Sequence, residues 1–263
     1  MKVAVVIPAA GSSVRFGDRD KLAQDLGGRP LLLRTVEVFT KCDEVVQILV
    51  AAPPDALDEF KDQFGAPLGF LGVTVVPGGR TARWESVRAA LDHIQDDASH
   101  VIVHDAARPA VSSRLLRDVL TAAETYDAVI PGVPVVDTLK RVEASASTVA
   151  AAEEDVLADS ILGDAGKVTV TTQSVVETID RANLMAIQTP QCFTLELLRR
   201  AFASANLDGV TDDAMAVERL GEPVHVIPGD PTNMKVTTPE DLQTIRLIMG
   251  IKGEAKRPAH KRF

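Results

Sequence analysis

The segment Val3-Ala4-Val5-Val6-Ile7-Pro8-Ala9-Ala10-Gly11-Ser12-Ser13-Val14-Arg15 decides the fold of this chain. Its first five residues are apolar and mostly β-branched, which predicts a buried strand. The small residues from Pro8 onward predict a tight turn whose backbone N–H groups can surround phosphate oxygens. Arg15 and Lys21 would add positive charge there. The segment therefore indicates a phosphate-binding loop at a sheet edge, although an ordinary strand-to-loop turn uses the same small residues.

The composition limits the class of protein. The chain has 263 residues, of which 46% are hydrophobic and 25% charged, as in soluble globular domains. Its net charge of −9 argues against a nucleic-acid partner but leaves room for a compact anionic ligand. Cys42 and Cys192 lack metal-type spacing, which favours a reducing compartment. Without a signal peptide or an apolar run of membrane-spanning length, the chain is expected to be cytoplasmic, with no membrane partner.

Short apolar runs alternate with helical patterns along the chain. The runs at residues 3–7, 45–50, 73–76 and 101–103 are separated by helical patterns near 31–39, 55–64 and 84–94. Continuous apolar strands between helices predict a three-layer α/β fold with a mostly parallel, twisted sheet. Ligands of such sheets bind beyond the carboxyl ends of the strands. Residues 8–15, 78–79 and 104–109 all fall at that edge.

Each of these clusters also has a structural interpretation. Gly78-Gly79 suits any exit of the chain from a strand. Asp105 would serve equally as a turn cap paired with Arg108. A carboxylate that faces a phosphate loop is, however, well placed to hold Mg²⁺, which prefers hard oxygen ligands shared with substrate phosphates. We favour the metal interpretation for Asp105.

The later polar segments can be explained by local structure alone. Thr189 precedes a proline, as turn residues often do. Thr211 is expected to cap a helix that carries Asp212 and Asp213 in its first turn. Thr238 is expected to cap the last helix, with Pro239 at its first position.

Taken in order, these segments resemble those of one family, the 2-C-methyl-D-erythritol 4-phosphate cytidylyltransferases. The resemblance covers nearly the whole chain to about Met249, and His104-Asp105-Ala106-Ala107-Arg108-Pro109 is its most specific signature. The other matching segments are Pro8-Ala9-Ala10-Gly11 with Arg15 and Lys21, and residues 83–87, 134–140, 179–181, 189–191, 211–213 and 233–241.

The resemblance implies a single Rossmann-like domain of the nucleotide-diphospho-sugar transferase type over residues 1–250, with a projecting β-arm that forms a homodimer. It implies transfer of CMP from CTP to 2-C-methyl-D-erythritol 4-phosphate with Mg²⁺, so these small molecules are the expected partners. The alternative is a ribitol 5-phosphate cytidylyltransferase, which shares most nucleotide motifs and handles a similar polyol phosphate. A nucleotide-binding regulator that has lost its chemistry is a more remote alternative.

The resemblance also implies roles for single residues. Arg15, Lys21 and Lys235 would be catalytic. Arg15 and Lys21 would stabilise charge at the α-phosphate, Lys235 would assist on the other side, and Asp105 would bind the metal and the substrate. Contacts to the nucleotide would come from Pro8, Ala9, Ala10, Gly11, Ser12, Gly78, Gly79, Ser86 and Ala106. The acceptor would be held by Asp105, Arg108, Thr138, Thr189, Thr211 and, in an active site shared between subunits, by Arg181 of the partner subunit.

The chain departs from the family pattern mainly at residues 141–178, an interval longer than usual. Within it, residues 168–172 alternate valine and threonine, which predicts an additional strand in an enlarged dimer arm. A disordered insert fits the Ala- and Ser-rich composition nearly as well. The loop at residues 79–86 is one residue longer than usual in the family. Residues 251–263 are expected to form a basic, mobile and solvated tail.

Overall fold

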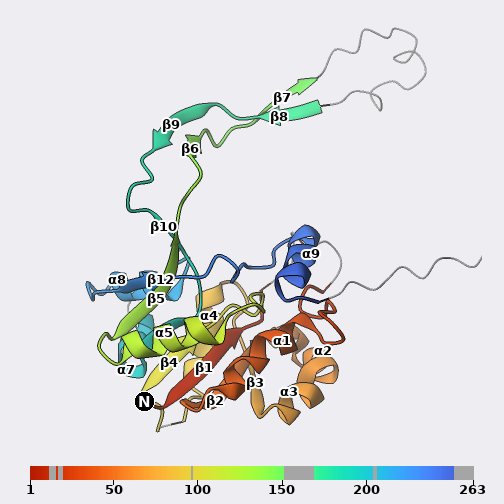
Figure 1. Ribbon diagram of the computed structural model, residues 1–263, viewed down its shortest axis with the longest axis vertical. Helices are drawn as coiled ribbons and strands as arrows, with labels where there is room; N and C mark the ends of the chain where they lie inside the picture. Colours follow the sequence, from red (N-terminus) through yellow and green to blue (C-terminus); the bar gives the residue numbers. More distant parts are fainter. Residues whose placement is uncertain (12–15, 17–19, 96, 151–168, 204–205, 252–263) are drawn as a thin grey trace, which may run out of the picture. The chain divides into compact units, whose positions relative to one another are not determined.

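A computed structural model describes residues 1–11, 16, 20–95, 97–150, 169–203 and 206–251. The chain divides into two compact units (Figure 1), Met1–Val133 with Ile187–Phe263, and Pro134–Ala186. Among the described residues, no helix combines the length and the apolar character that a bilayer crossing requires.

The first unit is built on β1 (Val3–Pro8), the strand predicted from the opening segment. It pairs in parallel with β2 (Val45–Ala52) on one side and with β4 (His100–Val103) on the other. Next to β2 lies β3 (Val73–Pro77), which is again parallel. The phosphate-loop segment and the segments after β3 and β4 therefore leave the sheet at one edge.

The other half of the sheet contains an antiparallel strand, β11 (Gln191–Thr194). It runs antiparallel to both β4 and β5 (Ala128–Pro134). β12 (His225–Pro228) pairs in parallel with β5. The order β5-β11-β4-β1-β2-β3 confirms the predicted, mostly parallel α/β sheet.

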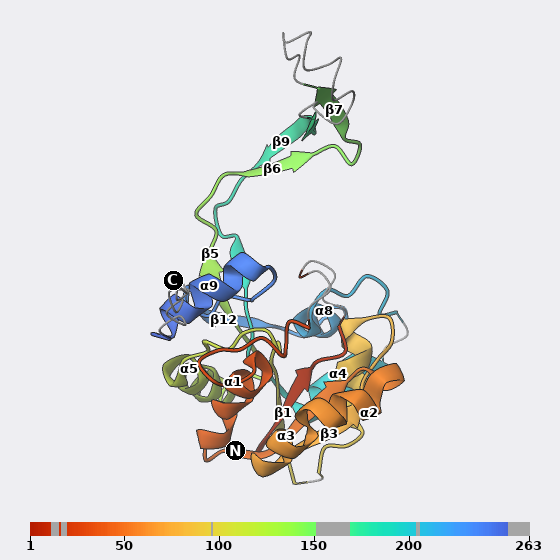
Figure 2. The same cartoon turned by 90° about the vertical axis from the view of Figure 1, so that its right-hand side faces the viewer.

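The side chains of β1 alternate between two cores. Val3, Val5 and Ile7 pack on one face of the sheet, and Ala4 and Val6 pack on the other, all fully buried. Burying one such valine or isoleucine contributes about 1.5–3 kcal/mol, so both faces stabilise the strand. The first face is covered by α1 (Leu31–Glu37), α5 (Ser113–Ala123) and α9 (Pro239–Ile248), and the second by α4 (Arg83–Leu91), α7 (Leu195–Ala203) and α8 (Asp213–Glu218). Figures 1 and 2 show the resulting three layers.

The helix expected at residues 55–64 is a succession of short helical segments. Pro67 supplies no backbone N–H for the preceding turn, so a regular α-helical ladder cannot continue through it. The segments are η3 (Pro54–Ala56), α2 (Leu57–Phe60), η4 (Lys61–Gly65) and α3 (Ala66–Phe70). A separate short turn, η2 (Phe39–Lys41), follows α1.

Two helix caps were predicted, and one prediction was wrong. Thr238 caps α9, where its hydroxyl accepts the N–H of Asp241 at 3.3 Å. α8 is capped by Asp212, whose carboxylate accepts the N–H of Met215 at 3.0 Å, and not by Thr211. A carboxylate interacts with the positive end of a helix more strongly than a hydroxyl does, which explains why Asp212 is the cap and Thr211 is not.

The second unit consists of paired strands. β6 (Leu139–Val142) lies antiparallel to β9 (Val175–Ile179), and β7 (Ser147–Ala150) lies antiparallel to β8 (Thr169–Thr172). β8 confirms the strand predicted from the valine–threonine alternation. β10 (Met185–Ile187) leads back to the first unit. Residues 151–168 and the tail at 252–263 lie outside the described residues.

Candidate active site

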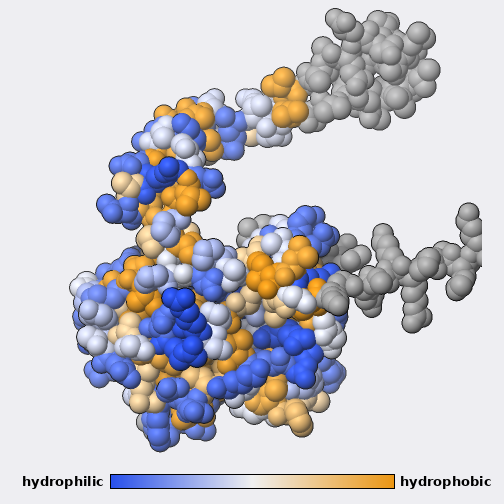
Figure 3. All heavy atoms as spheres, viewed as in Figure 1, coloured by the Kyte–Doolittle hydropathy of each residue, from blue (hydrophilic) through white to orange (hydrophobic). Residues whose placement is uncertain are grey.

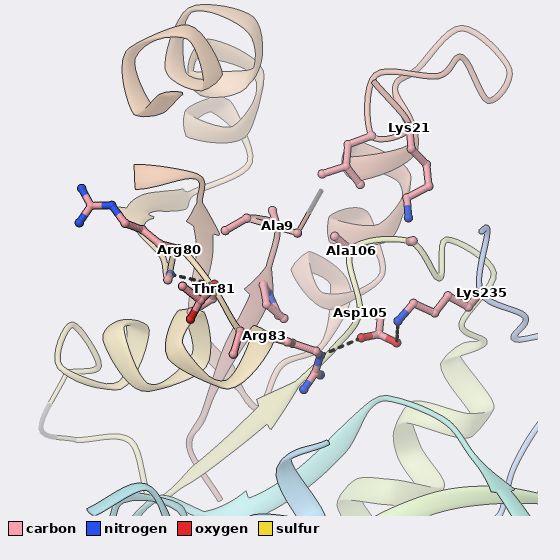
Figure 4. Close-up of a pocket in the computed structure, with 16 residues that line it drawn as sticks. Ala9, Lys21, Arg80, Thr81, Arg83, Asp105, Ala106 and Lys235 are labelled. Carbon is pink, nitrogen blue, oxygen red and sulfur yellow. Dashed lines mark hydrogen bonds and ion pairs between the residues drawn. The ribbon is translucent and has the colours of Figure 1, made fainter. Parts of the chain in front are cut away.

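A cavity of about 410 Å³ opens at the carboxyl ends of β1, β3 and β4. Figure 4 shows side chains around it from these three strand ends and from two further segments, which carry Lys21 and Lys235. Ten of the residues predicted from the sequence line it: Pro8, Ala9, Ala10, Gly11, Lys21, Gly79, Ser86, Asp105, Ala106 and Lys235. The fold thus brings together segments that are more than two hundred residues apart in the chain.

The charges on the cavity wall are unbalanced toward the positive. Within the described part of the chain, Asp105 is the only acidic side chain that lines the cavity, against the cationic Lys21, Arg80, Arg83 and Lys235. In Figure 4 the amino groups of Lys21 and Lys235 point toward the same part of the cavity. A chain of net charge −9 therefore presents a local site for an anion.

Asp105 is nearly buried and is surrounded by cations. Its Oδ1 lies 3.2 Å from Nε of Arg83, and its Oδ2 lies 3.2 Å from Nε of Arg108 and 3.1 Å from Nζ of Lys235. Burial acts to raise the pKa of Asp105, but the charges of these three partners outweigh it and hold the pKa below the ordinary range. The carboxylate is therefore ionised throughout the neutral pH range.

Arg83 joins this carboxylate to a second one. Its Nη1 lies 2.6 Å from Oδ2 of Asp213, which is fully buried at the start of α8. Arg83, Asp105 and Lys235 also line a second cavity, of about 170 Å³. Three further residues predicted to bind the acceptor, Arg108, Thr189 and Thr211, also line it, together with Ile187, Gln188, Gln191 and Asp212. The two cavities share the same charged group of residues, so molecules bound in them would meet there.

A buried hydrogen-bond chain supports Asp105 from behind. The N–H of Asp105 donates to Oγ1 of Thr189 at 3.0 Å, and this hydroxyl lies 3.1 Å from Nδ1 of His104. Nε2 of His104 lies 3.1 Å from the carbonyl oxygen of Arg108, which can only accept. Nε2 is therefore assigned the proton, and Nδ1 accepts from Thr189. Burial lowers the pKa of His104 to about 4, so the imidazole is neutral.

Glu85 organises the loop between β3 and α4. Its carboxylate accepts the N–H of Arg80 at 3.0 Å, and both the N–H and the hydroxyl of Thr81, at 2.9 Å and 2.6 Å. These bonds, above all that from the Thr81 hydroxyl, lower the pKa of Glu85 to about 2. A Cβ on Gly79 would lie 2.2 Å from Cβ of Glu85, so only glycine fits there.

The remaining predicted residues fall into three groups. Gly78 does not line the cavity but packs beneath it, since a Cβ there would lie 2.9 Å from Oγ of Ser86. Thr138 and Arg181 belong to the second unit and are exposed. Ser12 and Arg15 lie outside the described residues.

Sequence reasoning missed Arg83, Glu85, His104 and Asp213 as contributors to the site. All four stand in segments that carried the resemblance, which was the one available signal. Helix-start chemistry accounted for Asp213 locally, yet the structure buries it against an arginine 130 residues away in the sequence. No local pattern encodes such a pair.

A Rossmann-like sheet with a cationic cavity at its carboxyl edge, opening beside a second polar cavity, defines an α/β nucleotidyltransferase. The family model described as 2-C-methyl-D-erythritol 4-phosphate cytidylyltransferase matches residues 3–159 and 149–251. The chain belongs to this family of cytidylyltransferases, as its motifs predicted, and its class of reaction uses CTP.

Similar proteins span nearly the whole chain. The 2-C-methyl-D-erythritol 4-phosphate cytidylyltransferase of Rhodococcus jostii is 40% identical over 250 residues, which cover 94% of this chain and 95% of that protein. The protein of the same name from Streptomyces coelicolor is 40% identical over 252 residues, covering 94% and 85%. The crystal structure of the Thermus thermophilus enzyme superposes with a TM-score of 0.70 at 32% identity, covering 95% of this chain and all of that one.

The neutral His104 predicts a pH-dependent stability. Its pKa in the folded chain is about 4, against 6.5 when unfolded, so the unfolded state takes up the proton first as pH falls. Stability is therefore lost below about pH 6.5. The slope approaches about 1.4 kcal/mol per pH unit only below pH 6.5, so between about pH 6.5 and 5 the free energy of unfolding should fall by about 1.5 kcal/mol more in the wild type than in His104→Gln. Denaturant titrations at both pH values measure this difference, and equal losses in the two proteins would contradict it.

The Glu85 contacts predict a binding effect. In Glu85→Gln the charge-assisted hydrogen bonds to the loop become neutral ones, which weakens them by about 1–2 kcal/mol in total. The KM for CTP should therefore rise roughly tenfold, with kcat changed by less than about threefold. Glu59→Gln, at an exposed position on α2, is the control and should match the wild type. A Glu85→Gln enzyme with an unaltered KM would show that the loop keeps its shape without this carboxylate.

Proposed function

We propose that this protein transfers CMP from CTP to 2-C-methyl-D-erythritol 4-phosphate, giving 4-diphosphocytidyl-2-C-methyl-D-erythritol and pyrophosphate. The observation that carries the proposal is the pair of adjoining cavities that share Arg83, Asp105 and Lys235. The larger cavity is lined by glycine-containing loops and lysines, which suit a nucleoside triphosphate. The smaller one has the hydroxyls and arginines suited to a polyol phosphate.

The reaction is a single displacement at phosphorus. A phosphate oxygen of the acceptor attacks the α-phosphorus of CTP, and the bond from that phosphorus to the bridging oxygen of the β-phosphate breaks. No covalent link to the protein forms, so positioning and charge stabilisation supply the rate. We assign Lys21 and Arg15 to the α-phosphate and the leaving pyrophosphate, and Lys235 to the side of the attacking oxygen.

The other predicted contacts follow from this arrangement. Backbone N–H groups of Gly11 and its neighbours would surround the triphosphate. Ala9, Ala10, Gly79 and Ser86 would contact the base or ribose, with Pro8, Gly78 and Ala106 beside them. In the smaller cavity, Arg108 and Thr211 would face the acceptor phosphate and hydroxyls. Thr189 would act mainly by holding the backbone of Asp105, because its hydroxyl is already engaged with that N–H and with His104.

The donor set fits Mg²⁺ held jointly with substrate. The described residues contain no group of three or more His, Cys, Asp or Glu side chains that could hold a metal ion unaided. A single carboxylate plus phosphate oxygens and water is nevertheless a usual environment for Mg²⁺. An ionised carboxylate has about four lone-pair sites. The ion pair with Arg83 engages one site on Oδ1 of Asp105, and those with Arg108 and Lys235 engage both sites on Oδ2. These ion pairs leave a site on Oδ1 for an ion. When bound, the ion would neutralise charge on the phosphates.

We also propose a homodimer whose active sites are shared between subunits. The second unit exposes Val136, Val175 and Val176, with 77%, 58% and 58% of their surface accessible, and Figure 3 shows hydrophobic residues along the segment that carries β6 and β9. A second copy of the chain would cover them, with Thr138 and Arg181 of the arm serving the acceptor site. The two unpaired cysteines favour the cytoplasm as the location.

The substrate assignment predicts the outcome of one assay. Pyrophosphate release should require CTP, Mg²⁺ and 2-C-methyl-D-erythritol 4-phosphate together, with ATP and GTP at least about tenfold poorer. Each acceptor is offered separately. Equal or faster turnover of ribitol 5-phosphate would make the protein a ribitol 5-phosphate cytidylyltransferase, and nucleotide binding with no release for any acceptor would make it a regulator.

The shared site predicts complementation between two inactive chains. Lys21→Ala should lower kcat by roughly two or more orders of magnitude, and Arg181→Ala should also be nearly inactive. In a co-expressed, doubly tagged heterodimer of these chains, one site carries both lesions and the other carries neither. This heterodimer should have roughly half of the wild-type activity, because one of its two sites is intact. A doubly tagged Lys21→Ala dimer is the control, and a heterodimer no more active than it would place Arg181 in its own chain's site.

A further inference from the structure

Lys21 is held by the loop that follows it. The N–H of Leu22 donates to Oδ1 of Asp20 at 2.9 Å, and the carbonyl of Leu22 accepts the N–H of Leu32, in α1, at 3.1 Å. Leu22 and Leu26 are buried in the core beneath the loop. The backbone on either side of Lys21 is therefore fixed, and the position of this lysine depends on how residues 20–30 are seated.

Two arginines bind three consecutive carbonyl groups of this loop. Nη2 of Arg246 donates to the carbonyl of Asp25 at 2.8 Å. Arg34 donates through Nε to the carbonyl of Leu26 at 2.9 Å and through Nη2 to that of Gly27 at 2.8 Å. Gly27 has a positive φ of 67°, so the chain turns sharply where the arginines bind.

The two arginines come from different helices. Arg34 is on α1, which follows the loop directly, so its contacts are local. Arg246 lies in the last turn of α9, 221 residues from Asp25. Beyond it, the N–H of Ile251 donates to the carbonyl of Arg246 at 2.8 Å, and the Ile251 side chain packs on Gly27. The end of α9 is thus seated against the Lys21 loop.

The other end of α9 fixes Lys235. Val236 is fully buried, and its N–H donates to the carbonyl of Ala107 at 2.8 Å. Asp241 then accepts the N–H groups of Thr237 and Thr238, at 2.7 Å and 2.8 Å, which locks the chain between Lys235 and the helix. One short helix therefore connects the two lysines whose amino groups point toward the same part of the cavity.

We propose that Arg246 is a positioning residue for the reaction, and that α9 sets the place of Lys21 relative to Lys235. This inference rests on the proposed function of the two lysines. Removing the guanidinium would leave the carbonyl of Asp25 without its partner and let the loop move. A displacement of a catalytic group by about 1 Å costs on the order of a hundredfold in rate, so partial loosening should cost about tenfold.

The test compares Arg246→Ala with a matched control. Arg199→Ala removes a similar bond, from Nη2 to the carbonyl of Leu91 at 3.2 Å, between α7 and α4. We expect Arg246→Ala to lower kcat about tenfold with the KM for CTP changed by less than about threefold, and Arg199→Ala to keep the wild-type kcat. Arg246→Lys, which retains the charge and can still donate a hydrogen bond to the carbonyl of Asp25, should recover part of the loss.

A double-mutant cycle separates positioning from general stability. If Arg246 acts through Lys21, Arg246→Ala should have almost no further effect on kcat in a Lys21→Ala background, measured at high enzyme concentration. Hydrogen exchange, which needs no substrate, should show faster exchange at residues 22–27 in Arg246→Ala and unchanged exchange at β1 and β4.

The outcomes distinguish the two proposals. If the wild type is active, two results would overturn the positioning role of Arg246. One is a further tenfold loss of kcat when Arg246→Ala is added to Lys21→Ala, and the other is an unchanged kcat in Arg246→Ala alone. Failure of the wild type to release pyrophosphate would instead overturn the proposed function. In that case, hydrogen exchange at residues 22–27 that is as slow in Arg246→Ala as in the wild type would show that Arg246 does not hold the Lys21 loop either.

Discussion

The structure of the site depends on one nearly buried carboxylate, Asp105, with cations on three sides. A buried carboxylate is costly unless it is paired and hydrogen-bonded, and here Arg83, Arg108 and Lys235 supply the charge. They come from the start of α4, the turn after β4 and the segment before α9. The same ion pairs that compensate Asp105 therefore tie the walls of both cavities together.

This arrangement explains how a chain of net charge −9 builds a cationic site. Bringing Lys21, Arg83 and Lys235 together before an anion binds is unfavourable by mutual repulsion, and Asp105 offsets part of it. The groups are then already in place when charge develops at phosphorus, so little reorganisation is needed during the reaction. Asp105 thus acts first as the support of the cations, whatever it also contributes to substrate or metal.

The sequence predicted most of the features that depend on neighbouring residues, and it did not predict contacts between residues far apart in the chain. The apolar, mostly β-branched run of β1 and the apolar runs of the other strands are local signals. They correctly predicted the sheet, and a cavity opens at the edge that they indicated. The helix cap at Thr211 failed because Asp212, one residue on, competes for the same N–H groups with a full charge. The Arg83–Asp213 pair and the contact of Arg246 with the Asp25 carbonyl join residues 130 and 221 positions apart, so only the folded chain could reveal them.

The cations divide their work according to side-chain shape. Arg83, Arg34 and Arg108 each bind at least two acceptors at once, which suits a planar guanidinium with donors in a fixed fork. They connect parts of the protein and are largely buried. Lys235 is 40% exposed and presents a compact charge on a flexible stem. A side chain that must stay in contact with a phosphate group during a displacement needs this conformational freedom. The more rigid arginines around Asp105 limit it to positions close to the reacting phosphorus.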